Sequence, residues 1–460
     1  MKNKKFRYSL NSKAFIVGAV IIVLLFNAIL ISLDSKIPLE FDFTKGKIYE
    51  LSDETNAIID QIDEPIEIIF MTQGTEDEDL SLIKNILDKY SQRNSNISVR
   101  EVNAVKNPVE VQKYIQEYIN TYGSALTEGS LLIKQGERYD IVNSADFLNR
   151  NQGYSYTEQI VTTKLANFVD GMTLSTVYLT TGHGENLSAS TVKILEMGGY
   201  TVKSFDTLSE EFPTDNKSVV LICAPRADFS VEEIDKLDKY LEKGGNAQIY
   251  FEPLYDDVST PNLNNYLAGD WGIERQEQRV YDFANLYDMG YMVGELRDHE
   301  ITTPIKDSEK RGGYGPANSF TIATDKPSNV VVSPLLSTTD SAISDSSSGK
   351  FDVMMVATRE KMNYETNELI TGRLIVGGSS YIVNELPADA RFANEDILLN
   401  SFNWMNGGDT SLTVRAKELP GGMMSMTSTE FWTWFVILVV VVPLGTLAAG
   451  IVIFVKRRYK

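Results

Sequence analysis

The sequence has a single cysteine, Cys223, and only two histidines, His183 and His299. One thiol excludes an internal disulfide, a zinc site built from several cysteines, and the dithiol chemistry of a Cys-x-x-Cys pair. Cys223 lies within the apolar run 219–224, which is typical of a buried strand. A nucleophilic cysteine of the amidotransferase type needs small residues around a strained turn, so we interpret Cys223 as a core residue.

The chain also lacks a phosphate-binding loop. No Gly-x4-Gly-Lys-Ser/Thr sequence occurs, so the sequence predicts no ATPase activity. Gly182 and Gly184 follow a predicted strand, but the third glycine of a dinucleotide fingerprint is replaced by Leu187. We therefore expect no bound nucleotide, no cofactor and no metal site.

Two long segments are free of charge. Residues 14–33 and 431–455 are each long enough to cross about 30 Å of hydrocarbon, so we predict a membrane-spanning helix at both places. The first run is too long for a secretory signal and has no small-x-small cleavage site after it, which favours an uncleaved anchor.

Charge fixes the predicted orientation. The tails at 1–13 and 456–460 contain nine basic residues and no acidic one, which predicts that both ends are cytoplasmic. Residues 34–430 are then extracytoplasmic and carry a net charge of −29, since the whole chain carries −20. Such an acidic surface is unsuited to nucleic acid or anionic lipid.

The extracytoplasmic part divides into two predicted domains with a linker at 421–430. In residues 34–170, a strand at 66–71, a helix, a strand at 97–102, a second helix and a hairpin at 130–142 follow in the order of a thioredoxin-like domain. A helix at 156–169 then leads to the second domain.

Residues 171–420 begin with strands that alternate with helices. The run from Ser175 to Pro253 gives four strands, and Ser230 is the predicted N-cap of a helix that ends at Gly244. Val231, at the start of that helix, is predicted to share its buried face. This order predicts a Rossmann-like, doubly wound parallel sheet covered on both faces. The pattern loosens after Pro253, and residues 273–329 give no clear assignment.

Separated blocks of sequence carry a resemblance to a known family. They are Phe41-Asp42-Phe43-Thr44, Tyr49-Glu50-Leu51-Ser52, Tyr178-Leu179-Thr180-Thr181-Gly182-His183-Gly184-Glu185, Tyr240-Leu241-Glu242-Lys243-Gly244-Gly245, Gly372-Arg373-Leu374-Ile375-Val376-Gly377-Gly378-Ser379 and Leu399-Asn400-Ser401-Phe402-Asn403-Trp404. In this order the chain resembles the GldG-like auxiliary components of ABC transport systems, named after gliding-motility proteins. The resemblance implies a Rossmann-like central domain, also seen in an intraflagellar-transport protein, and a separate permease and ATPase as partners. The chain departs from the family at Gly378-Ser379-Ser380, where members often have an acidic residue.

The turn that contains Gly182, His183, Gly184 and Glu185 is the candidate ligand or partner contact. Ligands of open parallel sheets bind beyond the carboxyl ends of the strands, where this turn is expected. His183 with Glu185 is also compatible with acid–base chemistry, although one histidine and one carboxylate fall short of a metal site. The glycines alternatively serve only a tight turn.

Small and polar residues in the predicted spans indicate helix packing. Gly445 and Ala449 form a small-x3-small face on the second span, and Asn27 is a strongly polar group in the first. We expect these positions to contact a permease. The sequence thus favours a non-enzymatic, membrane-anchored auxiliary subunit of an ABC transporter. A surface enzyme, or a glycan-binding or adhesion protein that uses the His183 turn, is the alternative.

Overall fold

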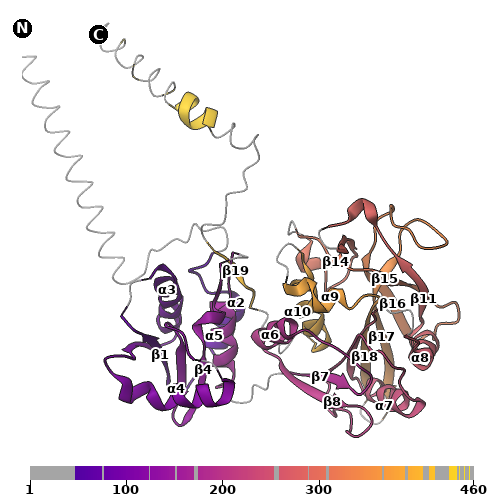
Figure 1. The fold of residues 1–460 in the computed structure, drawn as a ribbon, viewed down its shortest axis with the longest axis horizontal. Helices are drawn as coiled ribbons and strands as arrows, with labels where there is room; N and C mark the ends of the chain where they lie inside the picture. Colours follow the sequence, from indigo (N-terminus) through magenta and orange to yellow (C-terminus); the bar gives the residue numbers. More distant parts are fainter. Residues whose placement is uncertain are drawn as a thin grey trace, which may run out of the picture.

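The computed structural model describes residues 47–74, 77–123, 125–150, 153–169, 175–252, 258–287, 290–306, 310–364, 367–388, 392–407 and 414–419, together with 435–442, 445, 450 and 455. Two β-sheets with flanking helices make up most of this structure (Figure 1). The chain is therefore an α/β protein, as predicted, and both sheets are of mixed direction.

The N-terminal sheet has the strand order β2-β1-β3-β4. β1 (Ile66–Thr72) pairs in parallel with β2 (Ile97–Asn103) and antiparallel with β3 (Leu131–Gln135). β4 (Arg138–Val142) is the last strand and forms a hairpin with β3, which turns at Gly136 with φ +60°. Each of the four strands was predicted from the sequence, and so was the hairpin.

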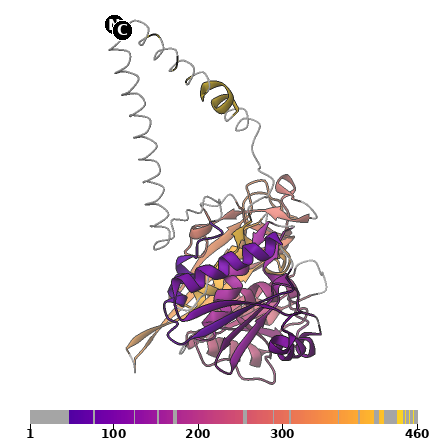
Figure 2. The same cartoon turned by 90° about the vertical axis from the view of Figure 1, so that its left-hand side faces the viewer.

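Helices cover both faces of this sheet. They are α2 (Asp53–Ile59), α3 (Glu78–Arg93), α4 (Pro108–Tyr122) and α5 (Thr157–Ala166). Ile68 and Phe70 of β1 pack in one core with α2, α3 and α5, whereas Ile69 and Met71 pack in another with Val111 of α4. This alternation follows from the two-residue period of a strand. Figure 2 turns the N-terminal sheet toward the viewer.

The second sheet has ten strands, and five of them are parallel. β7 (Thr176–Thr181), β8 (Thr201–Asp206), β9 (Val219–Cys223), β10 (Asn246–Tyr250) and β18 (Glu368–Gly377) lie in the order β8-β7-β9-β10-β18. The register confirms parallel pairing throughout this half. The strands predicted between Ser175 and Pro253 are all present.

The other half of the sheet is antiparallel, so the predicted parallel sheet extends only over the five strands described above. The strands of the antiparallel half are β11 (Ile273–Val280), β13 (Glu295–Leu296), β15 (Ala317–Ile322), β16 (Val330–Ser337) and β17 (Asp352–Asn363). β17 and β18 form a long hairpin, and a short connection can only join antiparallel neighbours. The unassigned stretch 273–329 supplies three of these strands, β11, β13 and β15, and the pairing of β11 with β15 has a register shift between Arg275 and Arg279.

Helices lie on both faces of the second sheet as well. They are α6 (Ala189–Met197), α7 (Val231–Glu242), α8 (Pro261–Trp271), α9 (Tyr381–Asn384) and α10 (Asn394–Met405). Leu221 and Cys223 of β9 pack in the core that includes α6, α9 and α10, whereas Val220 and Ile222 pack with α7 and α8.

Short elements complete the fold. They are η1 (Ser144–Asp146), β5 (Leu148–Asn149), β6 (Tyr154–Ser155), η2 (Phe283–Asn285), β12 (Met292–Val293), η4 (Thr303–Ile305), β14 (Gly313–Tyr314), η5 (Leu386–Ala388), β19 (Lys417–Glu418) and the π-helical turn η6 (Val436–Val441). β19 pairs with β6 in a separate small sheet of the order β19-β6-β5, so the chain returns from the second sheet to the N-terminal region.

Of the predicted spans, 14–33 lies entirely outside the described residues, and 431–455 is described only at 435–442, 445, 450 and 455. Within the described part of the chain, no helix is long and apolar enough to cross a membrane. Phe435 to Val442 are helical and stand apart from both sheets in Figures 1 and 2, with Phe435, Val436 and Val441 exposed.

The start of α7 is set by a capping box. Ser230 Oγ accepts a hydrogen bond from the Glu233 amide, and Glu233 accepts one from the Ser230 amide, which confirms Ser230 as the N-cap. Leu237 and Leu241 form the buried face of this helix, but Val231, which was predicted to share that face, is 73% exposed. Val231 lies roughly 135° around the helix from the centre of the buried stripe, so the prediction for this residue is wrong.

We predict that Ser230→Ala lowers the free energy of unfolding by about 1 kcal/mol, because it removes this cap. Urea unfolding followed by circular dichroism measures the change. The matched control is Asn107→Ala, since Asn107 occupies the N-cap of α4 without a capping side-chain bond. Equal losses in the two variants would contradict the role assigned to the capping box.

Candidate functional site

The candidate turn lies where the parallel strands end. Residues after β7, β9, β10 and β18 meet at this edge, as the backbone bonds from the Arg226 amide to the His183 carbonyl at 2.7 Å and from Asn186 to Cys223 at 3.0 Å show. The parallel strands lie in the order β8-β7-β9-β10-β18. The chain therefore moves from β7 to one side for β8 and to the other side for β9, which makes the position between β7 and β9 a topological switch point. The turn after β7 thus occupies the place where ligands of such sheets bind.

Both glycines of the turn are required by its backbone. Gly182 has φ +112° and Gly184 has φ +77°, values that side chains other than glycine rarely allow. A Cβ on Gly184 would also lie 3.1 Å from Cβ of Arg226. The tight-turn interpretation of the two glycines is therefore correct, whatever else the turn does.

His183 points inward, between two carboxylates. Its Nε2 lies 3.2 Å from Oε1 of Glu233, and its Nδ1 lies 3.4 Å from Oε1 of Glu185. The imidazole ring stacks on Phe229 with a centroid distance of 3.9 Å. Only 7% of the side chain is exposed, so the imidazole is covered on its edges and on one face.

The backbone around His183 is tied equally closely. Its amide donates to Oε2 of Glu185 at 2.7 Å, and its carbonyl accepts from the amides of Arg226 and Ala227 at 2.7 and 3.0 Å. The turn after β7 is thereby fixed to the turn after β9. The two nitrogens of the ring face opposite ways, so Glu185 and Glu233 cannot share one metal ion with this histidine.

Glu233 connects the turn to helix α7. Besides its capping bonds with Ser230, it accepts a hydrogen bond from the Thr207 hydroxyl at 2.5 Å. Burial alone would raise the pKa of Glu233, but the hydrogen bonds from Thr207 and Ser230 and the charge of His183 outweigh it and lower the pKa below its ordinary value of 4.5. Glu233 therefore remains a carboxylate that faces the imidazole.

The structure brings together His183 and Glu185, as the sequence indicated, and adds three partners that the sequence reasoning missed: Thr207, Phe229 and Glu233. The orientation of Glu233 could have been predicted from the sequence, because Ser230 and Glu233 form the Ser-x-x-Glu pattern of a capping box. That pattern fixes the direction of the carboxylate. Thr207 and Phe229 lie in connecting segments and gave no periodic signal. Of the three predicted membrane-packing residues, Asn27 and Ala449 lie outside the described residues.

Cys223 is fully buried in β9, as predicted. Burial, and then the charge of Glu252, raises the pKa of its thiol far above the ordinary value of 9.0, so the reactive thiolate is disfavoured. The strained position is the next residue: Ala224 has φ +53°, which is unusual for a residue with a side chain. The position that would hold a nucleophile in a strained elbow therefore carries a methyl group.

A serine-rich turn follows β18 at the same edge. The Ser380 hydroxyl donates to Oε2 of Glu252 at 2.5 Å, and Asn384 bonds the carbonyl of Asn186 at 3.1 Å. These contacts join the ends of β7, β10 and β18. No cluster of three or more potential metal ligands occurs among the described residues.

Comparison with known proteins leaves the function open. Residues 45–143 match a family described as a domain of unknown function (DUF7088). No curated protein matches the sequence. The match to the mmIFT52 N-terminal domain has 17% identity and a TM-score of 0.38, and covers 51% of this chain and 98% of that domain.

Two further solved structures match at lower similarity. A protein from Thermoplasma acidophilum, described as one of the subunits of GMP synthase, is 9% identical with a TM-score of 0.27, over 51% of this chain and 96% of that one. PurLQS from Thermotoga maritima is 8% identical with a TM-score of 0.29, over 51% of this chain and 100% of that one. Similarity at this level carries no argument about activity.

We predict that His183→Ala lowers the free energy of unfolding by about 2–4 kcal/mol, since it opens a cavity beside Phe229 and leaves two buried carboxylates without their imidazole. Urea unfolding measures the loss. The control is His299→Ala: this half-buried histidine accepts one backbone bond from Ile301, so a loss of roughly 1 kcal/mol is expected. A His183→Ala variant as stable as the wild type would contradict a structural role.

Glu233 predicts part of the acid sensitivity of the fold. Because its folded pKa lies below 4.5, its carboxylate stabilises the protein above that pH, and this stabilisation is lost as the pH falls through the folded pKa. Glu233→Gln retains a capping side chain but cannot ionise. We expect the melting temperature of this variant to fall less steeply below about pH 4.5 than that of the wild type. If the melting temperatures of the two proteins fell equally steeply below about pH 4.5, this contribution of Glu233 would be excluded.

Proposed function

We propose that the chain is a membrane-anchored auxiliary subunit of an ABC transporter. In this proposal it has no enzymatic activity, residues 34–430 are extracytoplasmic, and both termini lie in the cytoplasm. A permease and an ATPase on separate chains are its partners, because this chain has no phosphate-binding loop. The resemblance to GldG-like proteins motivates the proposal.

The observation that carries the proposal is that the two ends of the described body meet. The Lys417 ammonium donates to the carbonyl of Lys47 at 3.1 Å and to that of Glu50. β19 pairs with β6, and Leu419 is buried in the core of the N-terminal sheet. A domain whose two ends lie side by side is suited to two anchors in one membrane, and this arrangement supports the proposal.

A buried carboxylate holds the two ends together. Oε2 of Glu158, on α5, pairs with the Lys417 ammonium at 2.5 Å. Its Oε1 accepts a hydrogen bond from the amide of Ser52 at 2.7 Å, and Ser52 is the N-cap of α2. The segment that enters the body and the segment that leaves it are thus bonded to the same side chain.

The finer description of the fold belongs to this proposal. The order β2-β1-β3-β4, with helices between the strands and after the hairpin, supports a thioredoxin-like domain at 34–170 without its redox pair. The parallel order β8-β7-β9-β10-β18, covered on both faces, supports a Rossmann-like, doubly wound unit within 171–420. The pairing of β19 adds a short return of the second region onto the first.

The alternative, a surface enzyme or a glycan-binding or adhesion protein that uses His183, gains no support from the geometry. Both imidazole nitrogens face carboxylates, and Phe229 covers one face of the ring. The surface of the turn consists of Gly182 and Gly184, which are exposed. A partner that docks here would contact backbone and not the imidazole.

The proposal predicts a stable complex. Extraction of native membranes in mild detergent, followed by pull-down of the full chain and mass spectrometry, should recover a polytopic permease and a P-loop ATPase in a fixed ratio. The double variant Gly445→Leu, Ala449→Leu should lower this recovery by about fivefold or more, because bulky side chains keep helices apart.

The matched control is Gly450→Leu, which lies about 140° around the helix from Gly445. A Cβ at either glycine meets no atom within 4 Å, so neither change is expected to disturb the described fold. The control should retain both partners. Purification of the wild-type chain alone, or with envelope proteins only, would refute the transporter assignment.

A further inference from the structure

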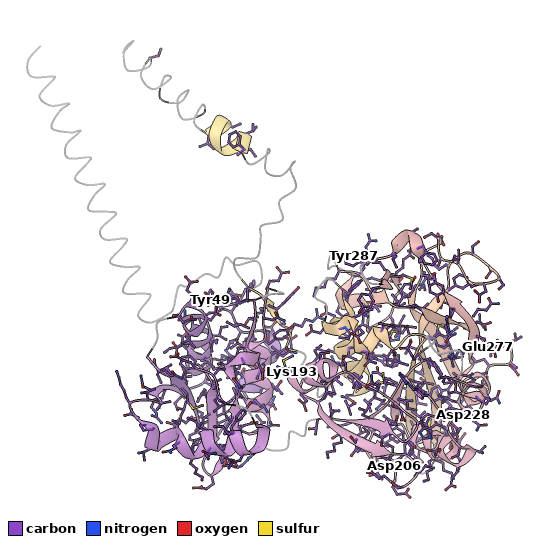
Figure 3. All side chains as sticks on the ribbon, viewed as in Figure 1. Tyr49, Lys193, Asp206, Asp228, Glu277 and Tyr287 are labelled. Carbon is purple, nitrogen blue, oxygen red and sulfur yellow. The ribbon has the colours of Figure 1, made fainter. Side chains whose placement is uncertain are left out.

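A cleft of about 820 Å³ lies between the two sheets. Its lining comes from α4, β4 and α5 on one side and from α6, β8 and the segment before α6 on the other. Lys193, labelled in Figure 3, marks this junction and forms an ion pair with Asp146 across it. Thr163 of α5 also donates to the carbonyl of Met197 on α6 at 2.9 Å.

The cleft is bordered by the last strand of each sheet. β4 ends the order β2-β1-β3-β4, and β8 ends the order of the ten-stranded sheet. Ile141 and Val142 of β4 line one wall, and Thr201 and Val202 of β8 line the other. An edge strand presents backbone donors and acceptors that further strands can pair with.

The direction of these groups on β8 follows from its pairing. The Thr201 amide donates to the carbonyl of Ser175 at 3.0 Å, so Thr201 faces β7. In a parallel pair alternate residues face the neighbour, so Val202, Ser204 and Asp206 face outward. The Asp206 amide is already bonded to Oε1 of Glu210 at 3.0 Å. Within the described structure, Val202 and Ser204 are left with outward backbone groups that no strand pairs.

The walls of the cleft disfavour an anionic occupant and offer apolar surface. Lys193 is neutralised by Asp146, and Lys164 pairs with Asp140 at 3.1 Å. Apolar side chains supply much of the remaining lining; they are Ile141, Val142, Ile160, Leu187, Val192, Met197 and Val202. An anionic ligand would find no unpaired lysine here and would face the carboxylate of Glu196, whereas alternating apolar side chains would find apolar surface.

We propose that the cleft binds an extended peptide segment of a partner protein, which adds to the free edge of β8. The peptide backbone pairs with Val202 and Ser204, and every second side chain packs into the cleft against α6 and β4. This is recognition by strand addition: backbone bonds provide affinity and pockets for alternate side chains provide specificity. The proposal does not depend on the partner being a transporter.

The direct test removes one outward amide. Val202→Pro deletes the Val202 N–H, whereas the bonds between β7 and β8 use Thr201 and Lys203 and remain. The full chain, held in detergent, serves as bait for a phage-displayed library of random heptapeptides. Enriched peptides are synthesised, and their affinity is measured by fluorescence anisotropy. We expect alternating apolar sequences that bind Val202→Pro about tenfold more weakly, the effect of one lost hydrogen bond and a distorted edge.

Three variants make the result specific. Ser204→Pro should weaken binding as Val202→Pro does, while Lys203→Thr should leave it within about twofold, because the backbone of Lys203 faces β7. Val192→Asp places a charge in the wall of the cleft and should also weaken binding. If thermal unfolding shows that the proline variants do not fold, the enriched peptide is synthesised with N-methyl groups on alternate backbone amides, and undiminished binding of both N-methylated registers would overturn strand pairing.

Other outcomes would overturn the proposal. Failure of any peptide to enrich would do so, as would peptides that bind both proline variants as tightly as the wild type. Peptides that respond to Val192→Asp alone would indicate a pocket ligand and not an added strand. A wild-type dimer in sedimentation that Val202→Pro abolishes, without enriched peptides, would assign the edge to a second copy of the chain.

Discussion

One buried ion pair, between Lys417 and Glu158, joins the two ends of the described body. The carboxylate also bonds the Ser52 amide, and the ammonium also bonds the carbonyls of Lys47 and Glu50. Removal of either charge would leave the other buried and unpaired, which typically costs about 3–5 kcal/mol. Most other ion pairs are exposed and contribute little. The contact between the segment that enters the N-terminal region and the segment that leaves it therefore depends on this ion pair.

Buried charged side chains are also paired within the protein at the edge of the second sheet. Glu233 faces an imidazole and two hydroxyl groups, and these fix the turns after β7 and β9 to the start of α7. Arg275 is held by the side chains of Asn318 and Thr260 and stacks on Phe251 at 3.9 Å. Burial lowers the pKa of Arg275 to about 10, yet it stays charged at neutral pH. The edge where a ligand would bind is thus filled by the protein's own polar side chains.

Sequence patterns predicted what is local. The strands from Ser175 to Pro253 and the Ser230 cap are each specified by neighbouring residues, through periodicity or a capping side chain. The antiparallel half of the sheet was missed because periodicity says nothing about which distant strands pair, and β11 and β15 are irregular. At the site, His183 and Glu185 were found because they share a turn. Glu233 was within reach of the capping-box pattern, whereas Thr207, Phe229 and the Lys417–Glu158 pair come together only through tertiary packing.

The position of the free edge of β8 restricts the kind of partner that can pair with it. An exposed edge strand risks pairing with any other edge, and proteins usually guard it with charge, irregularity or a cover. On β8 the exposed lysine Lys203 and the Glu210 cap on Asp206 guard part of the strand, and the N-terminal domain stands beside the remainder. Val202 lies in the wall of a cleft that α5 and β4 also line, so a second sheet has less room here than the single extended segment that we propose. The cleft therefore restricts access to the one kind of partner, a lone strand, that its apolar walls also suit.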